Sequence, residues 1–182
     1  MKKVMFVLAA AAMAVGVQAA QFEWTASNVR DGWNSGDNKI DGTAYLFLVG
    51  SEVTEASIAS AISGAADTTA LASTLSGKAI DTQSVASGGI AGTSPEGITA
   101  TAPANLFFVV ISGDNVYQSS AITADTIETL GSTTIAFGSQ KSASSAASAW
   151  KTVGGGGDVP EPTSGLLLLV GGAMLALRRK QK

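Results

Sequence analysis

The chain contains neither cysteine nor histidine among its 182 residues. Without cysteine it can form no disulfide bond, so an exported domain must be stabilised by hydrophobic burial alone. The two absences also remove the commonest ligands of zinc and copper and the commonest general base of enzymes. We therefore predict no cofactor, no metal site and no catalytic residue, and we expect a protein that is not an enzyme.

Charged residues are scarce as well, at 14% of the chain, and the net charge of −3 hides an uneven distribution. Six of the eleven basic residues lie close to the two ends of the sequence: Lys2, Lys3, Arg178, Arg179, Lys180 and Lys182. The body, residues 20–159, carries five basic against thirteen acidic residues and hence a net charge of −8. Such a surface repels phosphate backbones, so nucleic acid is excluded as an expected partner.

The first nineteen residues have the three parts of a secretory signal peptide. Lys2 and Lys3 form a basic start, and residues 4–17 form an uncharged, mostly apolar run. Val17 and Ala19 then place small side chains at the −3 and −1 positions of a cleavage site. We predict that residues 1–19 are removed by signal peptidase, with a cut after Ala20 as the alternative.

The last thirty residues form an ordered series of segments. Residues 153–158 are a glycine-rich linker, and Val159, Pro160, Glu161 and Pro162 follow it. The two prolines lack backbone donors and favour an extended chain, which is the shape that a protease cleft accepts. Residues 165–177 carry no charge, and Arg178, Arg179 and Lys180 come directly after them.

The uncharged run predicts a single transmembrane helix whose length is only just enough to cross the membrane. Thirteen residues give a helix of roughly 20 Å, whereas the hydrocarbon core is about 30 Å thick. Residues 162–164 and the snorkelling basic side chains extend this reach. The basic cluster favours the cytoplasmic side of the membrane, so we expect residues 20–152 to lie outside.

The motif at residues 159–164, the single hydrophobic segment and the basic tail at residues 178–182 together resemble the PEP-CTERM sorting signal. The resemblance covers residues 159–182 and does not extend to the central domain. It implies recognition in the inner membrane by an exosortase, a cysteine-protease-like enzyme, in bacteria that often make exopolysaccharide. It further implies transient anchoring in the inner membrane, followed by transfer to the cell surface or release. An ordinary C-terminal anchor is the alternative, and it does not need the Pro-Glu-Pro sequence.

Residues 20–152 predict one mainly β domain, either sandwich-like or a curved antiparallel sheet with helices on one side. The spacing of Ile58 and Ile62, and of Leu71 and Leu75, predicts two short helices within residues 51–75, with Asp67 capping the second. We expect residues 21–26 to form an edge-like strand because Phe22 and Trp24 alternate with polar residues. The seven expected strands are residues 21–26, 43–49, 78–84, 97–101, 105–111, 116–120 and 132–137.

The strongest local prediction is a β-hairpin with Gly113 and Asp114 as its two-residue loop. In this hairpin Val110 faces Tyr117 and Ile111 faces Val116. Alternate side chains of residues 106–111 then point to opposite faces of the sheet, and we expect both faces to be covered.

Two binding functions remain open from the residues alone. Asp31, Asn34, Asp37, Asn38 and Asp41 could offer oxygen ligands to calcium, but the EF-hand pattern fails, and such clusters usually form turns. Trp33 is the aromatic residue best placed, in a polar loop, to stack on a sugar. Trp24, Tyr45 and Tyr117 are better explained as core.

Two catalytic patterns are weak. Ser148 and Lys151 match the Ser-x-x-Lys pattern of β-lactamase-like enzymes, but the companion motifs are missing. The carboxylates Glu23, Glu52, Glu55, Glu96 and Glu128 show no spacing that selects a pair for glycoside hydrolysis. We therefore expect a structural or adhesive exported protein with exopolysaccharide as a candidate partner. A carbohydrate- or calcium-binding module is the alternative.

Overall fold

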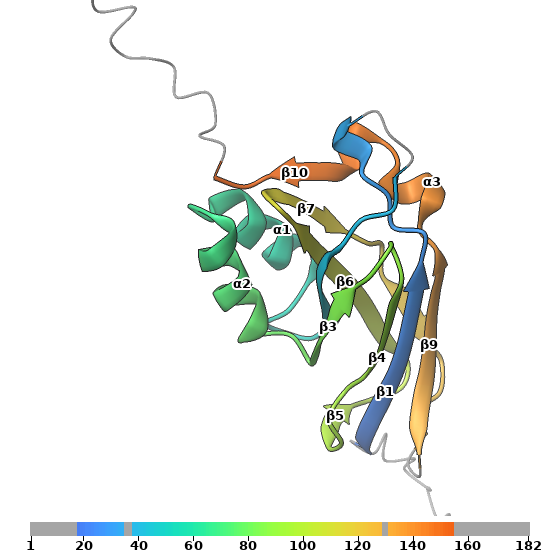
Figure 1. Ribbon diagram of the computed structural model, residues 1–182. Helices are drawn as coiled ribbons and strands as arrows, with labels where there is room; N and C mark the ends of the chain where they lie inside the picture. Colours follow the sequence, from blue (N-terminus) through green and yellow to red (C-terminus); the bar gives the residue numbers. More distant parts are fainter. Residues whose placement is uncertain (1–17, 35–37, 129–130, 155–182) are drawn as a thin grey trace, which may run out of the picture.

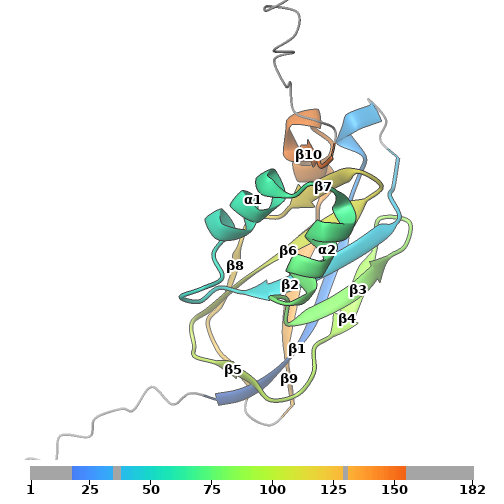
Figure 2. The same cartoon turned by 90° about the vertical axis from the view of Figure 1, so that its left-hand side faces the viewer.

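Two β-sheets lie face to face, and two helices cover the outer face of one of them (Figures 1 and 2). The computed structural model describes residues 18–34, 38–128 and 131–154. The first sheet contains β1 (Gln18–Ser27), β4 (Ile90–Thr93), β5 (Ile98–Ala100) and β9 (Ser132–Ser139). The second contains β2 (Gly42–Leu48), β3 (Asp81–Val85), β6 (Ala104–Ser112), β7 (Asn115–Gln118), β8 (Ile122–Ala124) and β10 (Trp150–Thr152). The expected β-rich architecture is confirmed.

β1 lies inside the first sheet, so the prediction of an edge-like strand is wrong. It pairs antiparallel with β4 and β5 and parallel with β9. The alternation of Phe22 and Trp24, both fully buried, correctly identifies the face that meets the core. This alternation carries no information about which edges of the strand are paired, because neighbouring strands pair through backbone hydrogen bonds. The parallel β1–β9 pair also shows that the first sheet is not purely antiparallel.

The second sheet is built around β2 and β6, and its hairpin has the predicted register. β6 and β7 pair antiparallel with Val110 opposite Tyr117 and Ile111 opposite Val116. β2 pairs with β6 on one side and β3 on the other, as its apolar sequence predicted for a central strand. Both faces of β6 are covered, because Phe108 and Phe107 belong to two different buried clusters.

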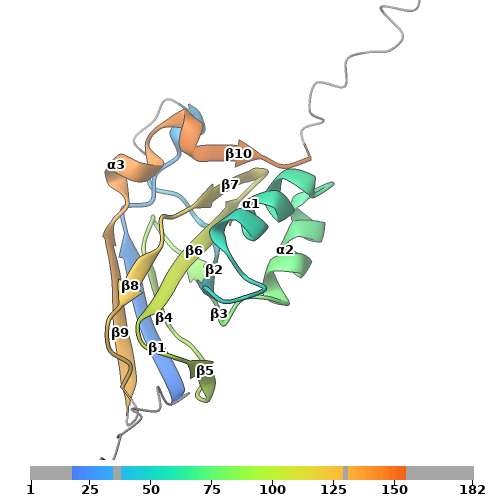
Figure 3. The same ribbon diagram turned by 180° about the vertical axis from the view of Figure 1, so that it is seen from behind.

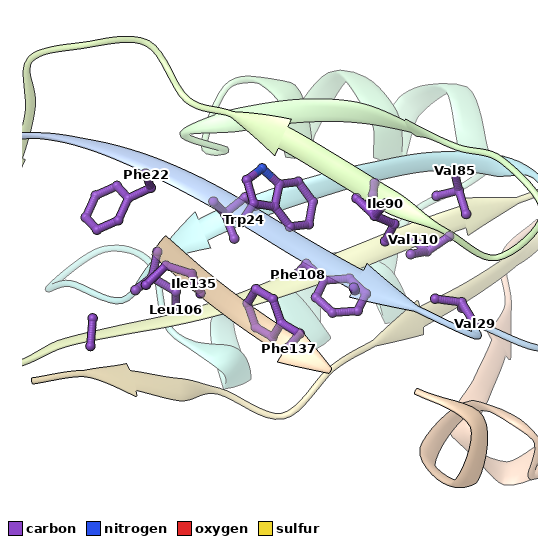
Figure 4. Packing of buried hydrophobic residues seen from close by; sticks show 14 of the residues in the cluster. Phe22, Trp24, Val29, Val85, Ile90, Leu106, Phe108, Val110, Ile135 and Phe137 are labelled. Carbon is purple, nitrogen blue, oxygen red and sulfur yellow. The ribbon is translucent and has the colours of Figure 1, made fainter. Parts of the chain in front are cut away.

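The inter-sheet core fills the space between the two sheets (Figure 4). Its aromatic centre is Trp24, Phe108 and Phe137, whose ring centroids lie 4.8–6.2 Å apart. The tilted and edge-on geometries are those that aromatic pairs prefer. The labelled aliphatic side chains around them are Val29, Val85, Ile90, Leu106, Val110 and Ile135.

The helix-side core lies between the second sheet and the helices α1 (Glu55–Gly64) and α2 (Thr68–Ser76). Both predicted helices are confirmed, together with their four buried residues Ile58, Ile62, Leu71 and Leu75. Asp67 caps α2 as predicted, since its carboxylate accepts the backbone N–H of Ala70 at 2.7 Å. Burying each of these aliphatic side chains stabilises the fold by about 1.5–3 kcal/mol.

The described residues form ten strands, where the sequence predicted seven. The additional strands are β4, β8 and β10, each only three or four residues long. Each has a single large apolar residue, so no alternating pattern can form within it. Two predicted strands were also placed imperfectly. β3 begins at Asp81 because Lys78 and Ala79 still hydrogen-bond to Leu75 of the preceding helix, and β9 is not the last strand.

The remaining elements connect the two sheets at one end of the molecule (Figures 1 and 3). They are η1 (Gly32–Asn34), α3 (Lys141–Ser144) and η2 (Ala147–Ala149). η1 belongs to the loop after β1, whereas α3 and η2 connect β9 to β10. The β3–β4 turn also joins the sheets, and its Gly88 has a φ of +70° and packs so closely on Val29 that a side chain has no room.

Candidate functional site

The sorting motif lies beyond the residues that the structure describes. This applies to Val159, Pro160, Glu161 and Pro162, to the predicted membrane segment 165–177, and to the basic residues Arg178, Arg179 and Lys180. Of the predicted signal peptide, only Gln18 and Ala19 are described. Within the described ranges, no helix is long and apolar enough to cross a membrane.

The attachment point of the tail is well defined. Val153 is only 4% exposed, and its backbone N–H donates to the Asp114 carbonyl at 2.8 Å. Gly154 follows with a φ of +75°, and a Cβ there would lie 3.0 Å from the Ala66 carbonyl oxygen. The last described residues are therefore held against the β6–β7 turn and the α1–α2 connection. The first two residues of the predicted linker, 153–158, are therefore part of the packed domain.

The start of β1 lies at the opposite end of the molecule from β10 (Figures 1 and 3). Ala19 is exposed and Ala20 is buried, and they pair with Thr99 and Ile98 of β5. The last two residues of the predicted signal peptide therefore extend β1. A cut after Ala19 retains Ala20 in the inter-sheet core, whereas a cut after Ala20 removes it.

The polar loop after β1 does not gather its oxygen atoms around one point. Asp41 is exposed and accepts the Ser87 backbone N–H at 2.7 Å, and Asn38 is exposed. Asp31 is buried, and no hydrogen bond to its Oδ1 is found within the described residues. Asp37 and the side chain of Asn34 lie outside the described part. Among the described residues, no group of three or more acidic side chains is placed to hold a metal ion.

Trp33 is half-buried rather than fully exposed in its loop. Its ring meets Trp150 edge-on, with centroids 4.5 Å apart, and it packs against the inter-sheet core. Trp150 is in turn fixed by donating from Nε1 to the Ser144 carbonyl at 2.7 Å. Trp33 therefore holds the loop after β1 against the segment before β10. Trp24, Tyr45 and Tyr117 are buried, as expected for core residues.

Tyr117 combines burial with a single specific partner. Its hydroxyl donates to Gln140 Oε1 at 2.8 Å, and burial raises its pKa to about 12. Burial also raises the pKa of Tyr45, with a hydrogen bond to Ser76 acting in the opposite direction. Neither phenol can act as a base near neutral pH. Both are structural groups.

The carboxylates Glu23, Glu52, Glu55, Glu96 and Glu128 are all exposed. Glu55 accepts the Ala121 backbone N–H at 3.0 Å, which fixes α1 to the second sheet. Ser148 is exposed, and Lys151 reaches Ser63 of α1 at 3.5 Å. These contacts assign structural roles to Glu55 and Lys151.

A shallow groove of about 280 Å³ lies where the two sheets separate, between β5 and the adjoining ends of β2 and β6. Thr99, Thr101 and Asn105 supply its polar side chains, and the rest of the lining is small or aliphatic. None of the lining residues titrates, so the groove offers no group for acid–base chemistry. Nothing in the sequence pattern predicted it, because its walls come from three separate strands.

No protein-family model, curated protein or solved structure matches this chain. The sequence pattern did not predict the hydrogen bond that joins the two sheets, in which Trp24 Nε1 donates to Asp81 Oδ2 at 2.6 Å. The only signal in the sequence was an acidic residue, Asp81, inside the weakly predicted strand 78–84.

Proposed function

We propose that this chain is a non-enzymatic exported protein with a structural or adhesive role, delivered to the cell surface or exopolysaccharide matrix by an exosortase-type system. The observation that carries the proposal is the order of the tail segments in the sequence: a glycine-rich linker, a Pro-Glu-Pro motif, an uncharged segment and a basic cluster. Signal peptidase and an exosortase-like enzyme are the processing partners, and the inner membrane is a transient one.

The position of the tail supports this function. Val153 ends the hydrogen-bonded part of the described chain, and the motif begins at Val159. The intervening residues include four consecutive glycines, a composition that is typical of flexible linkers. A processing enzyme at the membrane surface can therefore reach the motif without unfolding β10. The role of the domain in this proposal is to remain folded while its tail is cut.

Replacing Pro160, Glu161 and Pro162 together with alanine tests the proposal. Membrane insertion should persist, because the hydrophobic segment and the basic residues are unchanged. Processing should stop, because alanine favours helix over the extended shape that the cleavage site needs. The uncut chain should accumulate in the inner membrane, as measured by fractionation and immunoblotting.

Two controls define this experiment. Glu96→Ala removes one exposed carboxylate in the folded domain, as Glu161→Ala does in the motif, and it should leave processing unchanged. Replacing Arg178, Arg179 and Lys180 with alanine should instead disturb retention or orientation. If the triple-alanine chain is processed and exported like the wild type, the tail is an ordinary anchor and the proposal is wrong.

A further inference from the structure

β9 lies at one edge of the first sheet, with β8 of the second sheet close by. Among the described residues, β1 is the strand that pairs with it, and no strand pairs with its other edge. Figures 1 and 3 both show β9 at the outer margin of the molecule, on the side away from α1 and α2. An edge strand offers unpaired backbone N–H and C=O groups, which form a template for another strand.

The edge lacks most of the usual protection against pairing. Natural edge strands carry lysine, proline or inward-pointing charges, or they are bulged. The sequence of β9, Ser-Thr-Thr-Ile-Ala-Phe-Gly-Ser, contains no charged residue and no proline. Its one irregularity is a bulge at Phe137, because Ala136 pairs with Thr25 and Gly138 with Ala26. The five residues before the bulge, Ser132–Ala136, remain regular.

We infer that β9 pairs antiparallel with β9 of a second copy of this chain, and that this pairing extends the first sheet across a two-fold axis. Such an isologous contact is self-complementary, so one sequence supplies both sides. The regular segment is symmetric about Thr134, which places Thr134 opposite Thr134 of the second copy and Ser132 opposite its Ala136.

The charge distribution favours a second copy in this orientation. The body carries a net charge of −8, so two copies repel each other except where their surfaces are uncharged. The exposed residues of β9, Thr134, Ala136, Gly138 and Ser139, are uncharged. Exposed Glu128 lies beside the start of β9, since its N–H donates to Thr133 Oγ1 at 2.9 Å, and exposed Lys141 follows its end. Antiparallel pairing brings the Lys141 end of each copy toward the Glu128 end of the other, whereas parallel pairing brings like charges together.

This inference deepens the proposed structural role and depends on it for its biological setting, because a matrix protein needs contacts between copies. The pairing itself is a property of the domain wherever the chain is located. The test is therefore made on purified full-length chain, so that its result is independent of export and tail processing. A failure of sorting in cells would leave the cross-linking result unchanged.

The chain contains no cysteine, so single cysteines report contacts between copies directly. Directly opposite positions in an antiparallel pair have Cβ atoms about 4.5–5.5 Å apart, close to disulfide reach. Under mild oxidation Thr134→Cys should give disulfide-linked dimer as the main species on a non-reducing gel. Thr93→Cys is the matched control, because Thr93 and Thr134 are both exposed and both pair with Glu23, on opposite sides of β1. It should remain monomeric.

Mixing two variants tests the orientation. In the antiparallel pair, Ser132→Cys chain should cross-link with Ala136→Cys chain, and each variant alone should cross-link poorly. Parallel in-register pairing would give the reverse, with each variant cross-linking alone, and would overturn the antiparallel arrangement. Equal dimer yields from Thr134→Cys and Thr93→Cys, or no dimer from either, would overturn the pairing through β9.

Discussion

Trp24 of β1 donates a 2.6 Å hydrogen bond from Nε1 to Oδ2 of Asp81 in β3, and thereby joins the two sheets. The indole is fully buried, and the carboxylate is only partly exposed. Gln83 Nε2 donates to both oxygens of the same carboxylate at 3.1 and 3.2 Å. The link leaves the buried indole N–H satisfied, which matters because an unpaired buried donor is costly.

Removing the acceptor should therefore destabilise the domain. Asp81→Ala should lower the free energy of unfolding by about 1–3 kcal/mol, since the Trp24 N–H loses its partner inside the core. Asp81→Asn should cost less, because the amide oxygen can still accept. Urea denaturation followed by tryptophan fluorescence measures both. Asp125→Ala, at an exposed aspartate, is the control, and an equal loss in Asp125→Ala and Asp81→Ala would contradict this role.

Stability should fall in alkaline solution, in part through Tyr117. Its pKa is about 12 in the folded protein, against an ordinary value of 10.0. Well below pH 10.0 the phenol is protonated in both states, so its contribution to stability is complete. As the pH rises toward about 12, the unfolded chain loses this proton first, which favours unfolding.

The measurement compares wild type and Tyr117→Phe in urea at a series of pH values from 9 upward. The variant should be less stable at the lowest pH, because Gln140 loses the phenol hydroxyl. As the pH rises, the free energy of unfolding of the variant should fall less than that of the wild type. Some loss should persist, because burial also raises the pKa of Tyr45. Parallel pH profiles would show that Tyr117 does not titrate differently in the two states.

Two glycines should respond in opposite ways to alanine. At Gly32 a Cβ would lie 2.3 Å from the Ala146 carbonyl oxygen, so η1 or the α3–η2 segment must move. Overpacking of this kind typically costs about 1–3 kcal/mol. At Gly64, the last residue of α1, a Cβ meets nothing within 4 Å, and alanine should stabilise the helix by up to about 1 kcal/mol. Thermal denaturation of both variants measures this contrast, and the same shift in both would contradict it.

Calcium should not change the stability of the protein. Asp41 already accepts a backbone N–H, and the described acidic side chains form no cluster. The melting temperature should therefore be the same in millimolar calcium and in EDTA. Ligand at a hundredfold excess over its Kd would add about 2.7 kcal/mol, which is several degrees. A rise of that size, or calcium-dependent binding on a glycan array, would favour the binding-module alternative.

The parts of the fold that the sequence predicted are those set by local chemistry. The β6–β7 hairpin follows from an apolar run and a Gly-Asp turn, and α2 follows from Leu71, Leu75 and the Asp67 cap. The parallel pairing of β1 with β9 could not be predicted in this way, because it joins distant segments through backbone groups that every residue has. β10 was missed for a related reason. It has only three residues, and its pairing with β7 depends on where Trp150 packs.

The same distinction applies to the functional sites. The proposed sorting motif can be predicted from the sequence because its residues are contiguous and in a fixed order. The open edge of β9 cannot, because a sequence does not show which strand ends a sheet. Trp33 shows a related limit, since a tryptophan in a polar loop suggests a sugar platform but its packing partners cannot be predicted from the loop. Its edge-on contact with Trp150 became visible only when distant segments were brought together.

The intact mass of the mature protein, measured separately in the inner-membrane and surface fractions, tests the sorting proposal most directly. The surface form should begin at Ala20, or at Gln21, and end within residues 159–164. A longer form that still ends at Lys182 should be confined to the inner membrane. A surface form that retains residues 165–182 would contradict the proposal.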